Sequence, residues 1–145
     1  MNKYLLIVIV LVVILSAGVV YRNFFLPKSS VPVDSGHVKE ITIIAKKNEW
    51  RFIPEEVDIA RGDTVIATVI NEDDYDHGIA IDAFGVSQRM PAHSTITLTF
   101  TATQAGDFPF YCSVPCGEGD VNGGHRTHFD MIGTIHVQDM ISNKQ

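Results

Sequence analysis

Two cysteines, a histidine and a methionine lie close together between residues 112 and 131. Cys112 and Cys116 are four positions apart, and His128 and Met131 follow them. Thiolate and thioether sulfurs are soft ligands that favour copper over hard cations, and an imidazole completes a set able to hold both Cu(I) and Cu(II). A further histidine, His77, lies upstream in a segment with the composition of a strand. These residue types indicate a copper site and electron transfer.

The order of these residues resembles the signature C-S-x-x-C-G-x-x-H-x-x-M of the binuclear copper centre called CuA, found in subunit II of haem-copper oxidases and in nitrous oxide reductases. Six positions match it in order: Cys112, Ser113, Cys116, Gly117, His128 and Met131. The segment His77-Gly78-Ile79 matches the one that supplies the first histidine in this family. The resemblance spans about Glu40 to Val137.

The resemblance implies a complete set of metal ligands and a role in electron transfer. In the family, both cysteines bridge two copper ions that share one unpaired electron, so each ion shifts little on reduction and transfer is fast. No catalytic site of its own is predicted for the chain. Six residues would hold the two coppers: Cys112 and Cys116 as bridges, His77 and Met131 on one ion, and His128 with the backbone carbonyl of Val114 on the other.

One departure from the signature is an insert before the second histidine. Residues 117–127 separate Cys116 from His128, whereas the signature has room only for Gly-x-x. Removing residues 120–127 restores Cys-Gly-Glu-Gly-His-Phe-Asp-Met, and Asn-Gly-Gly within the insert is typical of a turn, so we interpret it as a looped excursion. We predict that His128 is the ligand and His125 a residue at the rim, because His128 keeps the step to Met131.

Two other uses of the cysteines are open. Oxidising compartments favour a disulfide, but a bridge across so short a loop removes little entropy from the unfolded chain. Zinc held by both cysteines and a histidine is the second alternative. Neither explains why His128 and Met131 follow in the order of the signature, and zinc leaves His77 without a role. We therefore expect copper.

An apolar segment, residues 4–20, opens the chain and is about 17 residues long, the lower limit for a membrane-spanning helix. Lys3 before it and Ser16-Ala-Gly near its end also fit a cleavable signal peptide. We expect an uncleaved anchor because the apolar run exceeds a usual signal core. The remainder would then lie on the extracytoplasmic side, periplasmic or extracellular.

Composition divides the chain into four parts. Residues 1–22 are the predicted anchor or signal peptide, 23–38 a linker rich in Pro, Ser and Gly, 39–139 the predicted domain, and 140–145 a C-terminal tail. About 105 residues beyond the linker are enough for one hydrophobic core. A single domain on a membrane anchor is therefore expected.

Within the domain, apolar and polar residues alternate in short runs, which predicts strands. Residues 95–100 are the clearest case, because Ile96, Leu98 and Phe100 fall on one face and three threonines on the other. Seven runs are separated by turn residues: 41–44, 57–59, 64–70, 77–81, 95–100, 108–111 and 132–137. Seven or eight strands at this spacing predict an antiparallel sandwich. With the resemblance, the expected fold is all-β: a cupredoxin-like Greek-key β-sandwich preceded by one N-terminal transmembrane helix.

The charge distribution bears on partners. All 17 acidic residues but nine of the 11 basic ones lie beyond residue 22, so that part has a formal charge of about −8. Such a domain repels nucleic acid and attracts a basic electron donor such as a c-type cytochrome. The acidic run 72–76 directly precedes His77 and is either a docking surface or a solvated loop. Trp50 stands where the family presents an aromatic to incoming electrons, with core packing as the alternative.

Three functions compete on these grounds. The first is subunit II of a haem-copper respiratory oxidase, which takes electrons from a c-type cytochrome or other carrier and passes them to subunit I. The second is a stand-alone carrier, because the insert could obstruct docking of subunit I. The third is copper binding or delivery without a redox role. Nitrous oxide reductase is not expected, since its CuA domain is joined to a large catalytic propeller that 145 residues do not hold.

Overall fold

The structure, a computed structural model, describes residues 2–24 and 35–139. The N-terminal unit is helix α1, Lys3–Phe24, in which Lys3–Tyr21 have a mean hydropathy of 2.9. A helix satisfies its own backbone hydrogen bonds, and α1 is long and apolar enough to cross a membrane. The predicted apolar helix is thus confirmed. The predicted tail, 140–145, and residues 25–34 of the predicted linker lie outside the described residues.

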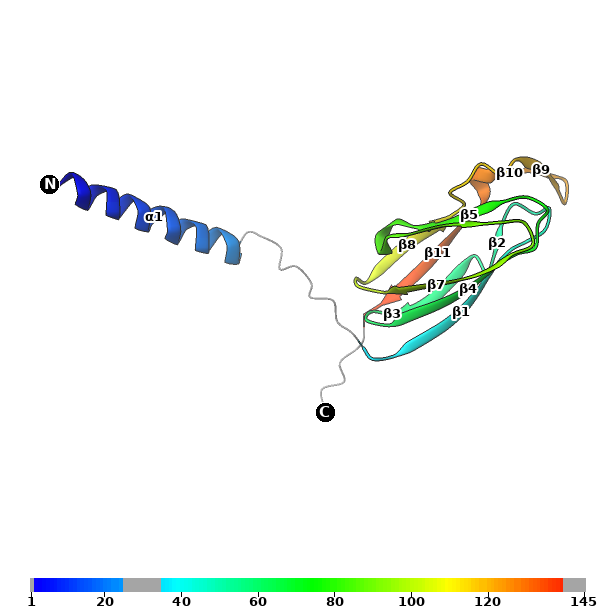
Figure 1. Cartoon of the computed structure of the whole chain (residues 1–145), viewed down its shortest axis with the longest axis horizontal. Coiled ribbons are helices and arrows are strands. Elements are labelled where there is room, and N and C mark those ends of the chain that lie inside the picture. Colours follow the sequence, from blue (N-terminus) through cyan, green and yellow to red (C-terminus); the bar gives the residue numbers. More distant parts are fainter. Residues whose placement is uncertain (1, 25–34, 140–145) are drawn as a thin grey trace. The chain divides into compact units, whose positions relative to one another are not determined.

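The second unit is a sandwich of two β-sheets with a separate two-stranded hairpin at one end (Figure 1). One sheet has the order β2 (Phe52–Ile53), β1 (Val38–Ala45), β4 (Thr64–Asn71) and β7 (Thr95–Thr101). The other has the order β3 (Glu56–Ala60), β11 (Ile132–Gln138), β8 (Gly106–Tyr111), β5 (His77–Ile81) and β6 (Val86–Met90). The hairpin is β9 (Glu118–Val121) and β10 (Gly124–Thr127). Two short 3-10 turns complete the unit: η1 (Asp82–Phe84) and η2 (His128–Asp130).

Alternating side chains from both sheets fill the space between them. Val65, Ala67 and Val69 of β4 are buried while the residues between them are partly exposed. The predicted inward face of β7 is also correct, since Leu98 and Phe100 are buried. Burial of this apolar surface is the main force that holds the two sheets together. The sandwich therefore forms a rigid base for the loops at its ends.

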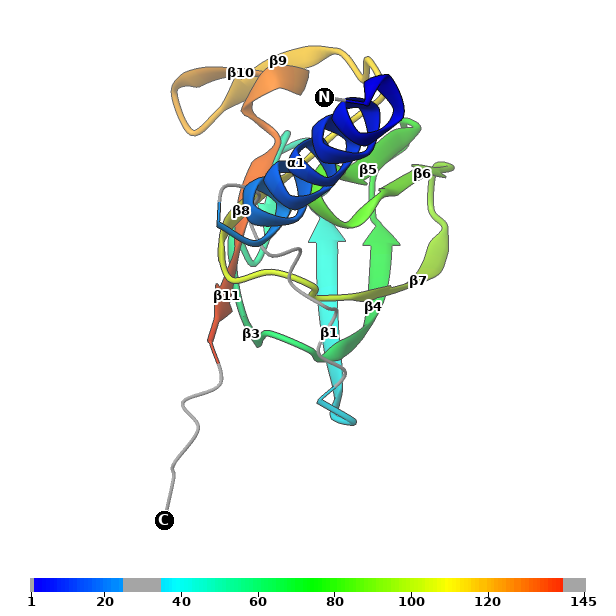
Figure 2. The ribbon, with the colours of Figure 1, turned by 90° about the vertical axis from the view of Figure 1, so that its left-hand side faces the viewer.

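Two strand pairs are parallel, which corrects the prediction of an antiparallel sandwich. β1 runs parallel to β4, as Figure 2 shows, and β3 runs parallel to β11. Neither pair is joined by a hairpin, since other strands lie between its two members in the chain. A period of two identifies which face of a strand is buried, but it carries no information on the direction of the neighbouring strand.

The seven predicted runs all lie within strands of a β-sandwich, so the predicted fold class is confirmed. The prediction missed β2, β6 and the β9–β10 hairpin. β2 has two residues, and β6 is an edge strand whose middle residues, 87–89, are polar and exposed. Neither presents the alternation by which the other strands are recognised.

Candidate metal centre

His77 opens β5, the strand whose five residues are all buried. Its ring is fully enclosed, and its two nitrogens face different partners. Nδ1 lies 3.8 Å from the Cys112 sulfur, and Nε2 lies 3.3 Å from the Asp73 carboxylate. The strand thus presents one nitrogen to the sulfur cluster while a buried carboxylate holds the other.

Cys112 comes directly after β8, where the chain leaves the sheet. Its backbone N–H donates to the Met131 carbonyl over 3.0 Å, and the Gly78 N–H lies 3.5 Å from its sulfur. The loop packs so closely on β5 that a Cβ at Gly78 would be 2.3 Å from the Ser113 hydroxyl oxygen. Only glycine at position 78 allows this approach without displacing the cysteine loop.

The sulfur atoms gather into one buried cluster. The two cysteine sulfurs are 3.6 Å apart, both thiols are free, and the Met131 sulfur lies 3.6 Å from that of Cys116. The ligand atoms of His77, Cys112 and Cys116 all lie within 4.8 Å of one another. The carbonyl oxygen of Val114 is 3.2 Å from the Cys112 sulfur. Five of the six predicted ligands are therefore brought together.

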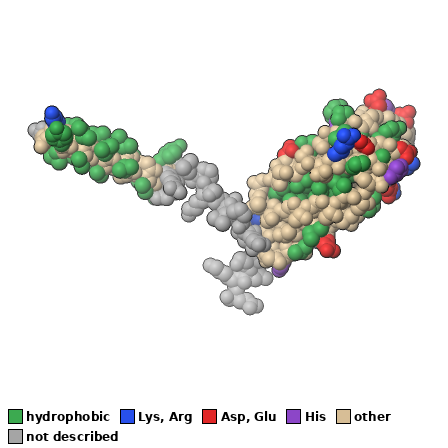
Figure 3. Space-filling model, in the orientation of Figure 1, with side chains coloured by type: hydrophobic (Ala, Val, Ile, Leu, Met, Phe, Trp, Pro, Cys, Tyr) green, Lys and Arg blue, Asp and Glu red, His purple; other side chains and the backbone are tan. Residues whose placement is uncertain are grey.

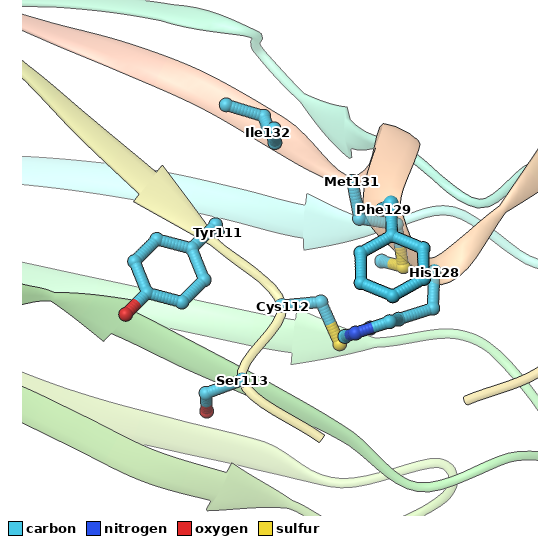
Figure 4. A pocket seen from close by; sticks show the side chains of 7 residues that line it. All are labelled: Tyr111, Cys112, Ser113, His128, Phe129, Met131 and Ile132. Atoms are coloured by element: carbon cyan, nitrogen blue, oxygen red, sulfur yellow. The ribbon is translucent and has the colours of Figure 1, made fainter. Parts of the chain in front are cut away.

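His128, the sixth, begins the turn η2. Thr127 caps this turn by accepting from the Phe129 N–H, and the Asp130 carboxylate accepts from the Thr127 N–H in return. Figure 4 shows the His128 ring pointing toward the Cys112 sulfur. Its Nδ1 is buried and has no hydrogen-bond partner among the described residues. A buried ring nitrogen without a partner is unfavourable unless something absent from the structure binds it.

The thiols and the histidine influence each other's protonation. The Cys116 thiol donates a hydrogen bond to Cys112, and with the help of His77 this lowers the pKa of Cys112 well below its usual range. Cys116 correspondingly keeps its proton, because the neighbouring thiolate raises its pKa. Burial lowers the pKa of His77, but its hydrogen bonds to Cys112 and Asp73 outweigh burial and raise it overall. The thiolate is the form of cysteine that binds metals.

Asp73 is a site residue that the sequence reasoning missed. Its carboxylate is fully buried and accepts from the backbone N–H groups of Asn48 and Asp74, besides contacting His77. Asn71 supports it, since the Asn71 side chain accepts from the Asp73 N–H over 2.9 Å. A carboxylate behind a metal-binding histidine fixes the tautomer and orientation of the ring.

The acidic loop 72–76 is not a free anionic surface, which a docking role would require. Asp73 is buried, and cations pair with the rest. The ion pairs are Glu72 with Lys46, Asp74 with Lys47, and Asp76 with Arg89. These cations are distant in sequence, so the ion pairs could not be predicted from the acidic run alone. The loop consequently carries little unpaired charge with which to attract a basic donor.

The insert is a regular hairpin rather than a looped excursion. Thr127 pairs with Glu118 and Arg126 with Gly119 across its two strands. Its inner face packs on the domain, because a Cβ at Gly119 would lie 2.3 Å from the indole ring of Trp50. His125 lies on the outer face and contacts Asp120 and Glu118, so it is away from the sulfur cluster.

Trp50 lies beneath this hairpin and is 7% exposed. Its indole N–H donates to the Cys116 carbonyl over 3.4 Å. It therefore braces the cysteine loop and belongs to the buried core. The alternative in which Trp50 is core packing is the one that the structure favours.

The donor set fits a soft metal ion. Three sulfurs and an enclosed imidazole converge, and a second imidazole ends beside them with an unsatisfied Nδ1. Zinc sites are built from thiolate and imidazole ligands, whereas a thioether in the cluster favours copper. The arrangement can thus bind copper. Because the sandwich fixes the strands and loops that carry the ligands, it can keep them in place in both oxidation states.

Comparisons with known proteins agree with this picture. A family model described as cupredoxin-like domain matches residues 6–121. Nitrous-oxide reductase of Stutzerimonas stutzeri is 31% identical over 90 residues, which are 60% of this chain and 13% of that protein. The chain therefore spans a small part of this relative.

Solved structures show the same fold. Reduced auracyanin from Roseiflexus castenholzii has a TM-score of 0.56 and 18% identity, with 71% of this chain and 99% of that chain covered. The periplasmic domain of subunit II of cytochrome oxidase from Bradyrhizobium japonicum has a TM-score of 0.50 and 20% identity, with 68% and 83% covered.

Proposed function

The chain belongs to the cupredoxin-like domain family, a copper-binding electron-transfer fold, and from this premise we propose that it carries electrons through a binuclear copper centre of the CuA type. We further propose that it is subunit II of a haem-copper oxidase. The sequence signature from Cys112 to Met131, the preceding His77 and the apolar helix α1 support this assignment.

The observation that carries the proposal is the pair of free thiols facing each other across 3.6 Å, with the His77 ring 3.8 Å from the Cys112 sulfur and the His128 ring pointing toward the same sulfur. A single blue copper uses one cysteine, two histidines and a weak methionine ligand. A second buried thiol in the same cluster would have no ligand role at such a site. Two thiolates side by side are what two bridged metal ions need.

The same six residues would hold the copper pair: bridging Cys112 and Cys116, His77 and Met131 at one end, and His128 with the Val114 carbonyl at the other. When bound, the pair takes up and releases a single electron. The protein would keep the ligand positions fixed during this electron uptake and release. Asp73 orients the ring of His77, the Gly78 N–H faces the Cys112 sulfur, and Trp50 holds the carbonyl of Cys116. Burial of the cluster excludes water from the sulfurs.

The anchor and the charge of the domain complete the proposal. With α1 in a membrane, the domain would face the extracytoplasmic side, receive electrons from a basic c-type cytochrome or similar donor, and pass them to subunit I. A second candidate, a stand-alone membrane-tethered carrier, is favoured by one observation. The β9–β10 hairpin ends at Thr127, directly before His128, so it would obstruct an acceptor subunit that docks at this histidine.

Spectroscopy of the copper-loaded full chain in detergent tests the proposal. We expect two coppers per chain, a purple colour and an EPR signal in which one electron is shared equally by two copper nuclei. A blue spectrum with one copper at full loading would refute the binuclear assignment. Affinity purification from native membranes then separates the two candidates, since a subunit II brings haem-containing subunit I with it and a stand-alone carrier does not.

A further inference from the structure

Two large apolar side chains stand exposed at the metal site. Phe129 is 78% exposed and Ile132 is 54% exposed, and both line a pocket of about 250 Å³ together with Cys112 and His128 (Figure 4). Phe129 and His128 also line a second hollow, of about 480 Å³, on the hairpin side. Phe129 therefore projects between two depressions, and a complementary surface of another protein can fit around it.

This ring is also a short distance from the proposed metal ligands. The centroids of the His128 and Phe129 rings are 4.6 Å apart. A partner that covers Phe129 would be separated from the copper pair by little more than the imidazole of His128. Close approach matters because electron transfer weakens steeply with distance.

Negative charge that no lysine or arginine neutralises lies near the ring. Asp82 accepts from the Tyr111 hydroxyl over 3.0 Å, and Tyr111 lines the first pocket. Glu118 lines the second, and both it and Asp120 contact only His125 as an ionic partner within residues 35–139. None of these three carboxylates forms an ion pair with lysine or arginine in that part of the chain. Figure 3 shows acidic side chains gathered at this end of the domain.

The two other candidate docking surfaces are closed. Trp50 is covered by the hairpin through Gly119, and the carboxylates of residues 72–76 are buried or paired. Taking the proposed electron-transfer function as given, we propose that the redox partner docks over Phe129 and Ile132, and that it presents an apolar contact ringed by basic side chains. Apolar centres give such complexes affinity, while complementary charge raises the association rate.

The test uses the copper-loaded full chain in detergent and a reduced, basic c-type cytochrome as the probe in stopped-flow measurements. The double variant Phe129→Ser with Ile132→Ser should lower the second-order rate constant by at least about fivefold. Tyr75→Ser is the matched control, because Tyr75 is 50% exposed within the rival loop 72–76. Phe129→Leu, which keeps the surface apolar, should retain most of the rate.

Charge variants provide the second arm. A triple variant that neutralises this rim should associate more slowly at low salt, and its rate constant should depend less on ionic strength. The substitutions are Asp82→Asn, Glu118→Gln and Asp120→Asn. A second triple variant, in the loop 72–76, should have an association rate constant close to that of the wild type. Its substitutions are Glu72→Gln, Asp74→Asn and Asp76→Asn. The proposal is overturned if the loop variant slows the reaction more, or if the serine double variant reacts at the wild-type rate. Loss of self-association in the double variant, with unchanged cytochrome rates, would instead assign this surface to a second copy of the chain.

Copper content, the EPR signal and reduction by ascorbate are recorded for each variant. These readouts should stay at wild-type values if only docking is affected. Absence of the shared-electron signal in the wild-type chain would be a failure of the proposed function, whereas a normal centre with an insensitive rate is a failure of the docking proposal alone.

Discussion

The backbone N–H of His128 donates a hydrogen bond to the carbonyl oxygen of Gly117 over 2.9 Å, although residues 118–127 lie between them. This bond continues the β9–β10 ladder, in which Thr127 pairs with Glu118. Because the two strands of a hairpin return to the same place, the insert lengthens the chain without separating Cys116 from His128. A departure from the family spacing is thus compatible with an intact site.

Deletion of residues 120–127 should leave the copper pair in place. The joined segment would read Cys-Gly-Glu-Gly-His-Phe-Asp-Met, and the His128 N–H already lies beside the Gly117 carbonyl, two residues before the new junction. We expect two coppers per chain and an unchanged EPR pattern. Loss of the shared-electron signal would show that the hairpin itself positions His128.

Replacement of the two neighbouring histidines should have opposite results. His128→Ala removes the buried Nδ1 that has no protein partner, so it should abolish the shared-electron EPR signal. His125→Ala is the matched control and should leave the spectrum nearly unchanged, because His125 contacts carboxylates on the outer face of the hairpin. The reverse result would transfer the ligand role to His125.

Replacement of either bridging sulfur should destroy the centre. A serine hydroxyl cannot bridge two copper ions as a soft thiolate does. Cys112→Ser and Cys116→Ser should therefore each give at most one copper per chain and no equally shared electron, as metal analysis and EPR will show. Retention of the purple spectrum in either variant would exclude a thiolate-bridged pair.

Met131→Leu should keep both coppers but shift the reduction potential. The thioether is a weak ligand, while the thiolates and imidazoles provide most of the affinity. Leucine has a similar volume, so the buried position of Met131 should tolerate it, with a stability loss below about 1.5 kcal/mol. Metal stoichiometry and voltammetry measure the two quantities, and release of copper on this change would make Met131 a principal ligand.

Asp73→Asn should weaken copper binding although Asp73 is not itself a ligand. The buried carboxylate holds Nε2 of His77, and loss of such a partner typically lowers metal affinity roughly 10- to 100-fold. Competition with a copper chelator measures this change. Asp74→Asn is the control, since Asp74 is exposed and pairs with Lys47 at the surface. Equal effects of both substitutions would remove the special role of the buried carboxylate.

The sequence predicted what depends on residue type and local period. Alternation in residues 95–100 identified the inward face of β7, and the spacing from Cys112 to Met131 identified residues that the structure places in one cluster. These features are local, because side chains two apart on a strand share a face and a short loop keeps its ligands close.

The features that the sequence did not reveal depend on contacts between distant segments. Asp73 looks like its acidic neighbours, and only the positions of Asn48 and His77 in space make it a buried acceptor. The pairing of Glu72 with Lys46 is invisible for the same reason. Likewise, Asn-Gly-Gly predicted a turn, but the flanking residues are too polar for their hairpin to be recognised.

The parallel pairing of β3 with β11 affects the order in which this protein matures. β3 comes early in the domain, yet it pairs with β11, the last described strand, since Val57 pairs with Ile135. Met131 directly precedes β11, and its carbonyl receives the Cys112 N–H only once that strand is seated. Such long-range closure is a late event in folding. Until β11 pairs with β3, Met131 is not held beside Cys116, so we expect stable copper binding only after this closure of the domain.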